Sequence, residues 1–251
     1  MINVRIINPE QVKQLFKEWG LFATECYATP EEFAEKVGKS CFQSEHYSGS
    51  RTEYIKFKIS GVDRGIAEQA MRHEIGVRNY VEDNSYDENP NNIVKNMQSF
   101  RYVDKDNFDY SIPKNIKNNN EALLEYVATM ETINEKRKNI QNILLEAGVP
   151  EREALEDANY VLPRATNTSL TIGFTPEALI HYMHKRLCTC SQDFHRQLAK
   201  QMKQEVAKIL PELADKLVPH CDYLLWCPES KRRSCGKHPV KEDLMKKLRG
   251  E

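Results

Sequence analysis

A short alternating segment that leads directly into a helical one is the feature that most constrains the fold of this chain. From Tyr54 to Ile59 every second side chain is apolar, and the apolar positions are Ile55, Phe57 and Ile59. This alternation predicts a strand with one face on a core. We expect Gly61 to end the strand and Asp63 to cap the helix that follows. That helix is indicated by three- and four-residue steps at Ile66, Ala70, His73 and Val77.

Similar patterns predict the other elements. Strands are expected at residues 2–7 and 170–174, and helices at residues 9–19, 121–147 and 151–159. Two further helices are expected to begin after Thr29-Pro30 and Thr175-Pro176, and the second carries an apolar stripe as far as Phe194. We predict an α+β fold in which a mostly antiparallel sheet packs with long helices. One domain is expected over residues 1–218, with a basic, cysteine-containing extension over 219–251.

Composition excludes several classes of protein. The net charge is −1, so no general attraction to nucleic acid or to a membrane surface is indicated. No apolar run approaches the length of a membrane span, and the first residues lack the layout of a signal peptide. The seven cysteines show no disulfide framework. We therefore expect a cytoplasmic protein with reduced thiols and no membrane partner.

Two polar stretches interrupt the pattern of elements. Asn79 to Asn92 is rich in Asn, Asp and Glu, and it is interpreted as a solvated excursion, or alternatively as an active-site lid or a subunit contact. Asp104 to Asn120 is interpreted as a link between the sheet and the long helix.

Two groups of polar residues have the chemistry of an anion site. Helical spacing puts Gln69, Arg72 and His73 along one edge of a buried stripe, where charge is costly unless a polar or anionic group meets it. Further along, Ser99 and Arg101 lie beside backbone N–H groups, which suits a phosphate clasp.

These two groups resemble the ends of one family signature. Flavin-dependent thymidylate synthases carry R-H-R-x-x-S-x-N-x-x-S-x-R-Y, and the matching segments here are Arg72-His73 and Asn96-x-x-Ser99-x-Arg101-Tyr102. Glu74 and Val77 differ from the signature, and Asn79 to Val94 is interpreted as an insertion within it.

Three other segments are similar to motifs of the same family. His46 and Ser48 match a loop before the strand, in which Thr52 replaces a second histidine. A later segment, D-A-N-Y-V-L-P, has Asn159 where the family has arginine. The helix after Thr175 matches at Arg186 and Gln192.

The resemblance implies a reaction: methylation of dUMP to dTMP with methylenetetrahydrofolate as carbon donor, NADPH as reductant and FAD as hydride carrier. It also implies a homotetramer whose sites are shared between subunits. The expected contacts to dUMP are Gln69, Arg72, Gln98, Ser99, Phe100, Arg101, Asn159 and Arg186. The expected contacts to FAD are Tyr54, Arg72, His73, Glu74, Thr175, Glu177 and His181. No G-x-G-x-x-G occurs, so a Rossmann site is not expected.

Arg186 is the candidate catalytic residue. A guanidinium at the edge of the helix stripe would favour an anionic N3/C2=O edge of the pyrimidine and so make C5 electron-rich. The plainer interpretation of Arg186 is a salt bridge to a neighbouring carboxylate. A thiolate of Cys188 or Cys190 is another candidate, but a C-x-C inside a helix would point its two thiols in divergent directions.

Three alternatives remain at this stage. A related hydroxymethylase or methylase acting on a pyrimidine nucleotide would use the same scaffold. A non-catalytic homologue would bind nucleotide, or nucleic acid through the basic tail, although we expect no nucleic-acid partner. Zinc could be bound by Cys221, Cys227 and Cys235 with His220 or His238, but their spacings differ from short paired knuckles. We therefore predict reduced thiols and no metal.

Overall fold

The structure is a computed structural model that describes residues 2–73, 93–101, 103 and 108–250. The chain divides into two compact units. Unit 1 comprises Met1–Asn3, Ile59–Arg72 and Asn96–Leu170, and unit 2 comprises Val4–Lys58, His73–Lys95 and Thr171–Glu251. Each unit is described below by itself.

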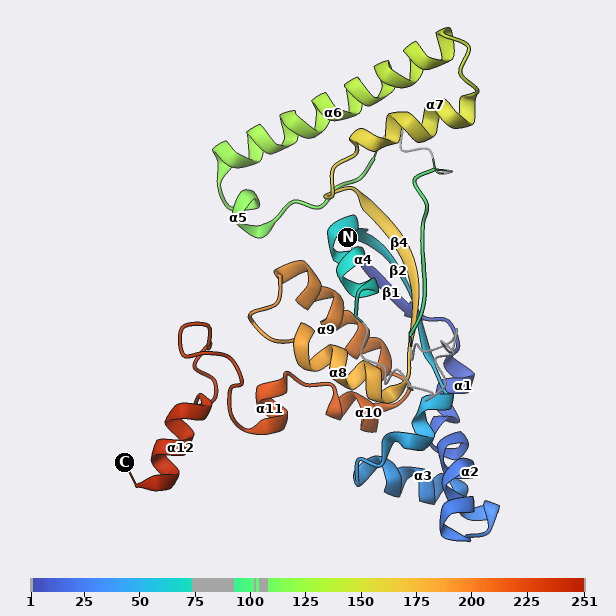
Figure 1. Ribbon diagram of the computed structural model, residues 1–251, viewed down its shortest axis with the longest axis vertical. Helices are drawn as coiled ribbons and strands as arrows, with labels where there is room; N and C mark the ends of the chain where they lie inside the picture. Colours follow the sequence, from blue (N-terminus) through green and yellow to red (C-terminus); the bar gives the residue numbers. More distant parts are fainter. Residues whose placement is uncertain (1, 74–92, 102, 104–107, 251) are drawn as a thin grey trace, which may run out of the picture. The chain divides into compact units, whose positions relative to one another are not determined.

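Helices and strands are mixed, as predicted, and the sheet is antiparallel. Its four strands have the order β1-β2-β4-β3 and comprise β1 (Asn3–Ile6), β2 (Ile55–Asp63), β3 (Ile93–Met97) and β4 (Asn167–Phe174). β1, β2 and β4 can be followed side by side in Figure 1. The prediction of an α+β fold is confirmed.

The predicted alternation in β2 is confirmed, but Gly61 does not end the strand. Ile55, Phe57 and Ile59 are buried, and beyond Gly61 the next buried side chain is Val62. The buried positions therefore change from odd to even, and Gly61 has a positive φ of 69°. Both features are typical of a β-bulge, in which glycine takes the left-handed conformation.

The N-terminal part of unit 2 is helical. It contains α1 (Pro9–Lys13), α2 (Leu15–Tyr27), the 3₁₀ turn η1 (Glu31–Phe33), α3 (Ala34–Gln43) and the 3₁₀ turn η2 (Tyr47–Thr52). The predicted helix at 9–19 is thus two helices, the second reaching Tyr27. α2 and α3 cross closely because Gly20 and Gly38 meet there: a Cβ on Gly38 would lie 1.8 Å from the carbonyl oxygen of Phe16.

The rest of unit 2 is helical and includes the C-terminal segment. It contains α8 (Pro176–Arg186), α9 (Asp193–Ala207), α10 (Pro211–Lys216), α11 (His220–Leu224) and α12 (Lys241–Arg249). The rings of Phe57, Phe174 and Tyr182 pack successively from β2 through β4 to α8, with centroids 6.3 and 4.9 Å apart. The single helix predicted from Thr175 to Phe194 is wrong, because residues 187–192 form a turn between α8 and α9.

Unit 1 contains α4 (Arg64–Met71), α5 (Lys114–Lys117), α6 (Asn120–Glu146), α7 (Glu151–Ala158) and the 3₁₀ turn η3 (Asn159–Val161). The long helix predicted at 121–147 is confirmed as α6, and α7 folds back beside it (Figure 1). Asp63 caps α4, as predicted, since its side chain accepts a 2.8 Å hydrogen bond from the Ile66 N–H. The helix predicted to continue to Val77 instead ends at Met71, with Arg72 as its C-cap.

Residues 74–92 lie outside the described part of the chain, so the interpretations of Asn79 to Asn92 and the predicted contact of Glu74 fall outside it too. The end of the proposed insertion belongs to β3, which begins at Ile93. Among the helices of the described residues, none combines the length and apolar character that crossing a membrane requires.

Candidate active site

α8 begins with a sequence that fixes its position. Thr175 is the N-cap, and its hydroxyl accepts a 3.3 Å hydrogen bond from the Ala178 N–H. Pro176 follows in the first turn, where its fixed φ suits a helix. Glu177 holds the helix to η2, because its carboxylate pairs with Arg51 at 2.8 and 3.4 Å. Thr175 and Glu177, both predicted to contact flavin, therefore lie together at the helix N-terminus.

Arg186 lies on the last turn of α8 and is half-buried. Its guanidinium carbon is 5.9 Å from the centre of the Tyr182 ring, one helical turn earlier, which is within the range of a cation–π contact. The Nε atom of Arg186 is buried and has no hydrogen-bond partner among the described residues. A salt bridge within the described chain, the plainer interpretation of this residue, is not observed.

Two buried histidines lie beside Tyr182. The Tyr182 hydroxyl and Nε2 of His195, on α9, are 2.7 Å apart and share a hydrogen bond. The His73 ring packs edge-on against Tyr182 with centroids 5.1 Å apart, and its Nε2 is buried without a partner among the described residues. The structure thus brings together His73 and Arg186, two of the predicted site residues.

Burial and charge keep both histidines neutral. Burial lowers the pKa of His73 to about 4, and the positive charge of Arg186 acts in the same direction. Burial likewise lowers the pKa of His195 to about 3, again with Arg186 contributing. At neutral pH this cluster therefore combines neutral imidazoles with a guanidinium, which stays charged in proteins. Such a site can stabilise negative charge on a bound ring.

The other predicted flavin contacts in unit 2 are more open. His181 is exposed on α8, with its ring 6.0 Å from that of His184. Tyr54 is half-buried immediately before β2, and its carbonyl oxygen accepts a 2.7 Å hydrogen bond from the Asn8 side chain. Burial raises the pKa of the Tyr54 hydroxyl.

The predicted phosphate clasp lies in unit 1, after β3. The Arg101 N–H donates to Oγ of Ser99 at 3.3 Å, and the Arg101 guanidinium pairs with Glu156 of α7 at 2.7 Å. Phe100 is buried between them, with the guanidinium of Arg64 over its ring at 4.9 Å. Arg101 and Ser99 therefore face solvent on a segment held by a buried aromatic ring.

Asn159 is a buried connector in unit 1. Its Nδ2 donates to the carbonyl oxygen of Phe100 at 2.7 Å, and its Oδ1 accepts from Arg137 of α6 at 3.2 Å. Arg137 is fully buried and also donates to Gln141 at 3.4 Å. Asn159 thus holds the segment that carries Phe100 and Arg101. The guanidinium that contacts Asn159 belongs to Arg137 of α6.

The remaining dUMP candidates lie in the same unit. Gln69 is half-buried on α4, and Arg72 is exposed at the end of that helix. The Gln98 N–H donates to the Ser169 carbonyl oxygen at 2.8 Å, which continues the pairing of β3 with β4.

Sequence reasoning missed three side chains of these clusters. Arg137 falls on the apolar stripe of α6, between Ile133 and Ile140, and a charge in that position is a readable signal. Tyr182 lies four residues before Arg186, the spacing at which helix side chains meet. His195 shares a face with Leu198 but carries no signal that separates it from an ordinary core histidine.

Comparison with known proteins decides the family. The Thy1 family model, described as thymidylate synthase complementing protein, matches residues 12–212. The chain belongs to the Thy1 family. The resemblance seen in the Arg-His and Ser-x-Arg-Tyr segments is thereby confirmed.

Two proteins named flavin-dependent thymidylate synthase are similar to this chain. The one from Nitratidesulfovibrio vulgaris is 30% identical over 205 residues, which are 82% of this chain and 77% of the relative. The one from Clostridium tetani is 31% identical over 214 residues, covering 81% and 78% of the two chains. The prediction of an enzyme family is confirmed.

A solved structure has the same fold. It is the UMP/dUMP methylase PolB from Streptomyces cacaoi, bound with 5-Br dUMP, and it superposes with a TM-score of 0.56 at 18% identity. The alignment covers 86% of this chain and 94% of PolB.

The residues around α8 fit a flavin chemically. An isoalloxazine ring is flat, with carbonyl oxygens and ring nitrogens along its edges. The buried Nε of Arg186 can donate to such an atom, and Nε2 of His73 can donate or accept, whereas neither has a partner in the described chain. Buried polar atoms normally have partners, so a bound heterocycle would satisfy both.

Proposed function

We propose that this protein is a flavin-dependent thymidylate synthase that converts dUMP to dTMP. Methylenetetrahydrofolate supplies the carbon, NADPH supplies the reducing equivalents, and FAD, when bound, supplies the hydride-carrying chemistry. The observation that carries the proposal is the half-buried Arg186, whose Nε atom is buried beside neutral histidines in a chain of the Thy1 family.

Arg186 is the proposed catalytic residue. Its charge favours the anionic form of the N3/C2=O edge of uracil, and this raises the electron density at C5. Tyr182 holds the guanidinium in place through its ring, and the low pKa of His73 and His195 prevents those groups from repelling it. Because the site is largely buried, each electrostatic interaction in it is stronger than it would be in water.

Residues around α8 are proposed to hold the flavin. His73, Thr175, Glu177 and His181 lie on or against that helix in unit 2, and Tyr54, in the same unit, directly precedes β2. Arg72 and Glu74 are kept as proposed contacts from the Arg-His motif. Arg51 orients Glu177 through their ion pair.

The segment after β3 is proposed to bind the phosphate of dUMP. Arg101 can exchange Glu156 for a phosphate or hold both, and Ser99 adds a hydroxyl. Asn159 supports this segment through the Phe100 carbonyl group, and Gln69, Arg72 and Gln98 are proposed to orient the nucleotide.

Release of tritium from 5-labelled dUMP tests the reaction. Protein that carries FAD should release tritium and form dTMP when NADPH and methylenetetrahydrofolate are both present, and omission of either should stop both. Flavin absorbance of the purified protein is the independent check of the cofactor. Protein that binds flavin and dUMP but forms no methylated product would refute the proposal.

A related pyrimidine-nucleotide hydroxymethylase or methylase is the second candidate. Asn159, which stands where the family has arginine, is engaged with Phe100 and Arg137, so the nucleotide contact at this position differs. The mass of the product formed from dUMP and from UMP separates the two candidates. A hydroxymethylated product, or preference for UMP, would favour the second.

The proposal extends to assembly and location. We propose a homotetramer with sites shared between subunits, a cytoplasmic location, and a domain over residues 1–218 followed by an extension over 219–251. Exposed apolar side chains on the α6–α7–η3 region of unit 1 support an assembly, and they include Leu124, Ile143, Tyr160 and Val161. Light scattering of the purified protein measures the assembly directly.

A further inference from the structure

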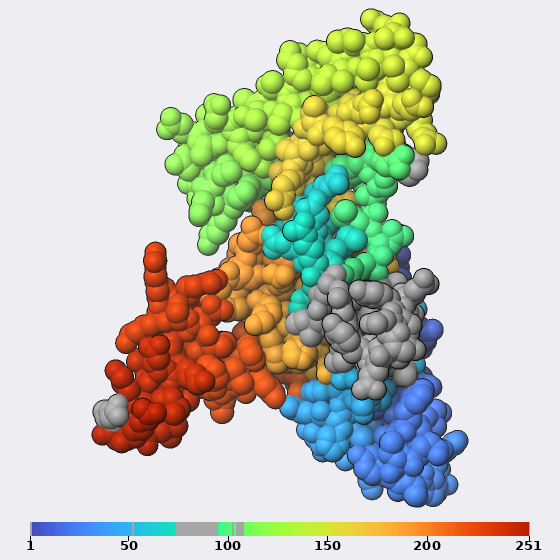
Figure 2. Space-filling model, viewed as in Figure 1, coloured from blue at the N-terminus to red at the C-terminus, as the bar shows by residue number. Residues whose placement is uncertain are grey.

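A cavity in unit 2 is lined by five of the seven cysteines. It has a volume of about 240 Å³ and lies between the α8–α9 turn (residues 187–192) and the C-terminal segment from Pro219 to Lys237. In Figure 2 this segment is coloured red and lies next to the orange α8–α9 region, and α11 packs on α8. The cysteines that line the cavity are Cys188, Cys190, Cys221, Cys227 and Cys235. Two segments distant in sequence thus bring thiols to one place.

Two of these thiols and a carboxylate group lie close enough to share one ion. The sulfur atoms of Cys188 and Cys190 and a carboxylate oxygen of Glu229 all lie within 4.8 Å of one another. In a tetrahedral zinc site with bonds of about 2.0–2.3 Å, two ligand atoms are about 3.5–3.8 Å apart. Each separation in the group therefore needs to shorten by no more than about 1.3 Å for all three atoms to bind one ion.

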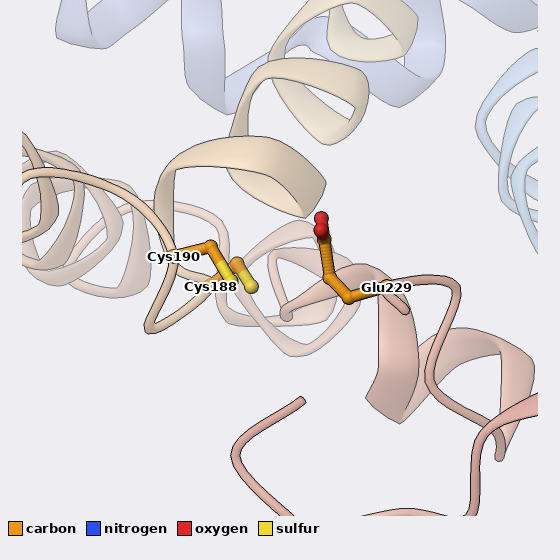
Figure 3. A group of neighbouring side chains, drawn as sticks. All are labelled: Cys188, Cys190 and Glu229. Atoms are coloured by element: carbon orange, nitrogen blue, oxygen red, sulfur yellow. The ribbon is translucent and has the colours of Figure 1, made fainter. Parts of the chain in front are cut away.

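The geometry of the turn explains why its two thiols lie together. Figure 3 shows the Cys188 and Cys190 side chains converging, while Glu229 comes from the C-terminal segment. The expectation that this C-x-C would diverge inside a helix is wrong, because α8 ends at Arg186 and both cysteines lie in the turn. The turn thus presents two sulfur atoms to the same point.

Arg233 connects the carboxylate group to one of the thiols. Its guanidinium lies 3.6 Å from the Glu229 carboxylate, which has a second oxygen atom for an ion. Its carbonyl oxygen accepts a 3.2 Å hydrogen bond from the Cys190 thiol. A metal ion would take the place of this weakly held proton, because metal-bound thiols are deprotonated. Two thiolates and a carboxylate carry three negative charges, which a divalent ion and the Arg233 guanidinium balance.

Other polar groups of the cavity are typical of a site that holds a hydrated ligand. Nε2 of His184, Oγ of Ser191 and Nδ1 of His220 are buried and have no hydrogen-bond partner among the described residues. All three residues line the cavity, and His184 is only 6% exposed. Buried polar atoms normally have partners, ordered water included. Water held with an ion in this cavity would supply them.

We propose that Cys188, Cys190 and Glu229 bind one Zn²⁺ ion, with water in the fourth position. Thiolates select zinc over Mg²⁺ and Ca²⁺, and zinc accepts sulfur and carboxylate oxygen together in a tetrahedron. Three protein ligands leave one position for water, as in other zinc sites that remain open to solvent. The proposal replaces the expectation of no metal, which rested on the spacings of the three later cysteines.

A second group of possible ligands is less suited to a cation. The ligand atoms of Cys221, Asp222 and His238 also lie within 4.8 Å of one another. The Asp222 carboxylate, however, pairs with the Lys237 ammonium group at 2.7 Å and with Nε2 of His238 at 2.8 Å. A cation at this position would be repelled by Lys237 and would displace the hydrogen bond of His238. Zinc is therefore assigned to the first group.

The ion would join the C-terminal segment to the turn that follows Arg186. Cys188 lies two residues beyond this proposed catalytic residue, which also lines the cavity. Glu229 lies beyond residues 12–212, the part of the chain that the Thy1 family model matches. The site thus depends on the C-terminal segment of this chain. Its test measures metal content and is independent of whether dUMP is methylated.

Metal analysis of the full-length protein tests the site. Protein purified without chelator or metal-affinity resin should contain one zinc ion per chain by plasma mass spectrometry. C188S, C190S and E229Q should each lose zinc during dialysis against a weak chelator that leaves the wild type loaded, because each removes one of three protein ligands. The controls E25Q and C26S, which alter neighbouring exposed residues on α2, should retain it.

A second measurement does not depend on the folding of variants. Wild-type protein, reduced and stripped with a strong chelator, should bind one Co²⁺ ion with the visible bands of tetrahedral coordination. Its sulfur-to-cobalt absorption should have the intensity of two thiolates, and Zn²⁺ should abolish it.

Several results would overturn the proposal. They are absence of both zinc and cobalt binding by the wild type, a cobalt spectrum of three or four thiolates, wild-type zinc content in any of the three ligand variants, and iron in place of zinc. Titration of only five of the seven thiols in unreduced, denatured, chelated protein would do the same, since it indicates a disulfide.

Discussion

Substitution R186M tests whether the charge of Arg186 drives the reaction. Methionine keeps much of the side-chain volume but removes the positive charge. The Arg186 side chain is half-buried and packs on Tyr182, so its effective dielectric constant is far below that of water. At about 4 Å from a unit negative charge and an effective dielectric constant of about 20, the interaction is worth about 4 kcal/mol. Since about 1.4 kcal/mol is tenfold in rate, we expect turnover to fall about a thousandfold.

The assay is tritium release under saturating dUMP, folate and NADPH, with flavin content measured on the same samples. Turnover of R186K should lie between that of the wild type and that of R186M, because lysine keeps the positive charge but lacks the planar guanidinium. K185M is the matched control, since it removes an exposed positive charge at the preceding position of α8. Flavin should remain bound in all three variants.

A second readout follows from the electrostatics of the cluster. Burial is the main cause of the low pKa of His73, and the charge of Arg186 is the second. R186M should therefore raise the pKa of His73, which NMR titration measures. Turnover of R186M equal to that of K185M would refute the role of the charge. An unchanged pKa of His73 would refute the proximity on which the role depends.

Three further predictions concern binding and stability. R101A should weaken the binding of dUMP by about 1.5–3 kcal/mol, the typical value of a charge-assisted hydrogen bond. This loss should raise the KM for dUMP with little change in kcat. Equal KM values for the wild type and R101A would contradict the proposed phosphate clasp. G38A should lower the free energy of unfolding by at least about 1–3 kcal/mol, because its Cβ would meet the Phe16 carbonyl oxygen, and urea unfolding measures it. His73 and His195 have a lower pKa folded than unfolded, so stability should fall as pH drops from about 6.5 toward 4, by up to about 1.4 kcal/mol per pH unit for each histidine. An unfolding free energy that does not change between pH 6.5 and pH 4 would contradict this prediction about the two histidines.

The sequence predicted the long periodic elements because their burial is regular. The apolar alternation of β2 and the three- and four-residue apolar spacing of α6 each repeat several times along the sequence. Both elements are present in the structure. The break between α8 and α9 was missed because Leu187 continues the apolar spacing of α8, and no glycine or proline marks residues 187–192. Gly61 was interpreted as a stop because a bulge inside a strand gives the same local signal.

The candidate site was partly predictable for a similar reason. Arg186 lies at the edge of an apolar stripe, and its position within a family motif singled it out. The network of Arg137 and Asn159 could not be inferred, because its partners are 22 residues apart and meet only through the return of α7 along α6. The convergence of five thiols likewise depends on a tertiary contact between the α8–α9 turn and the C-terminal segment.

The length of α6 has a consequence for how its sequence can vary. Its 27 residues extend about 40 Å, yet only Met130 and Arg137 are buried among the described residues. Changes at Leu124 or Ile143 should therefore leave the melting temperature of an isolated chain unaltered and, in the proposed homotetramer, change the concentration at which the copies dissociate. Substitutions on α6 can therefore separate what the folding of one chain requires from what the proposed homotetramer would require.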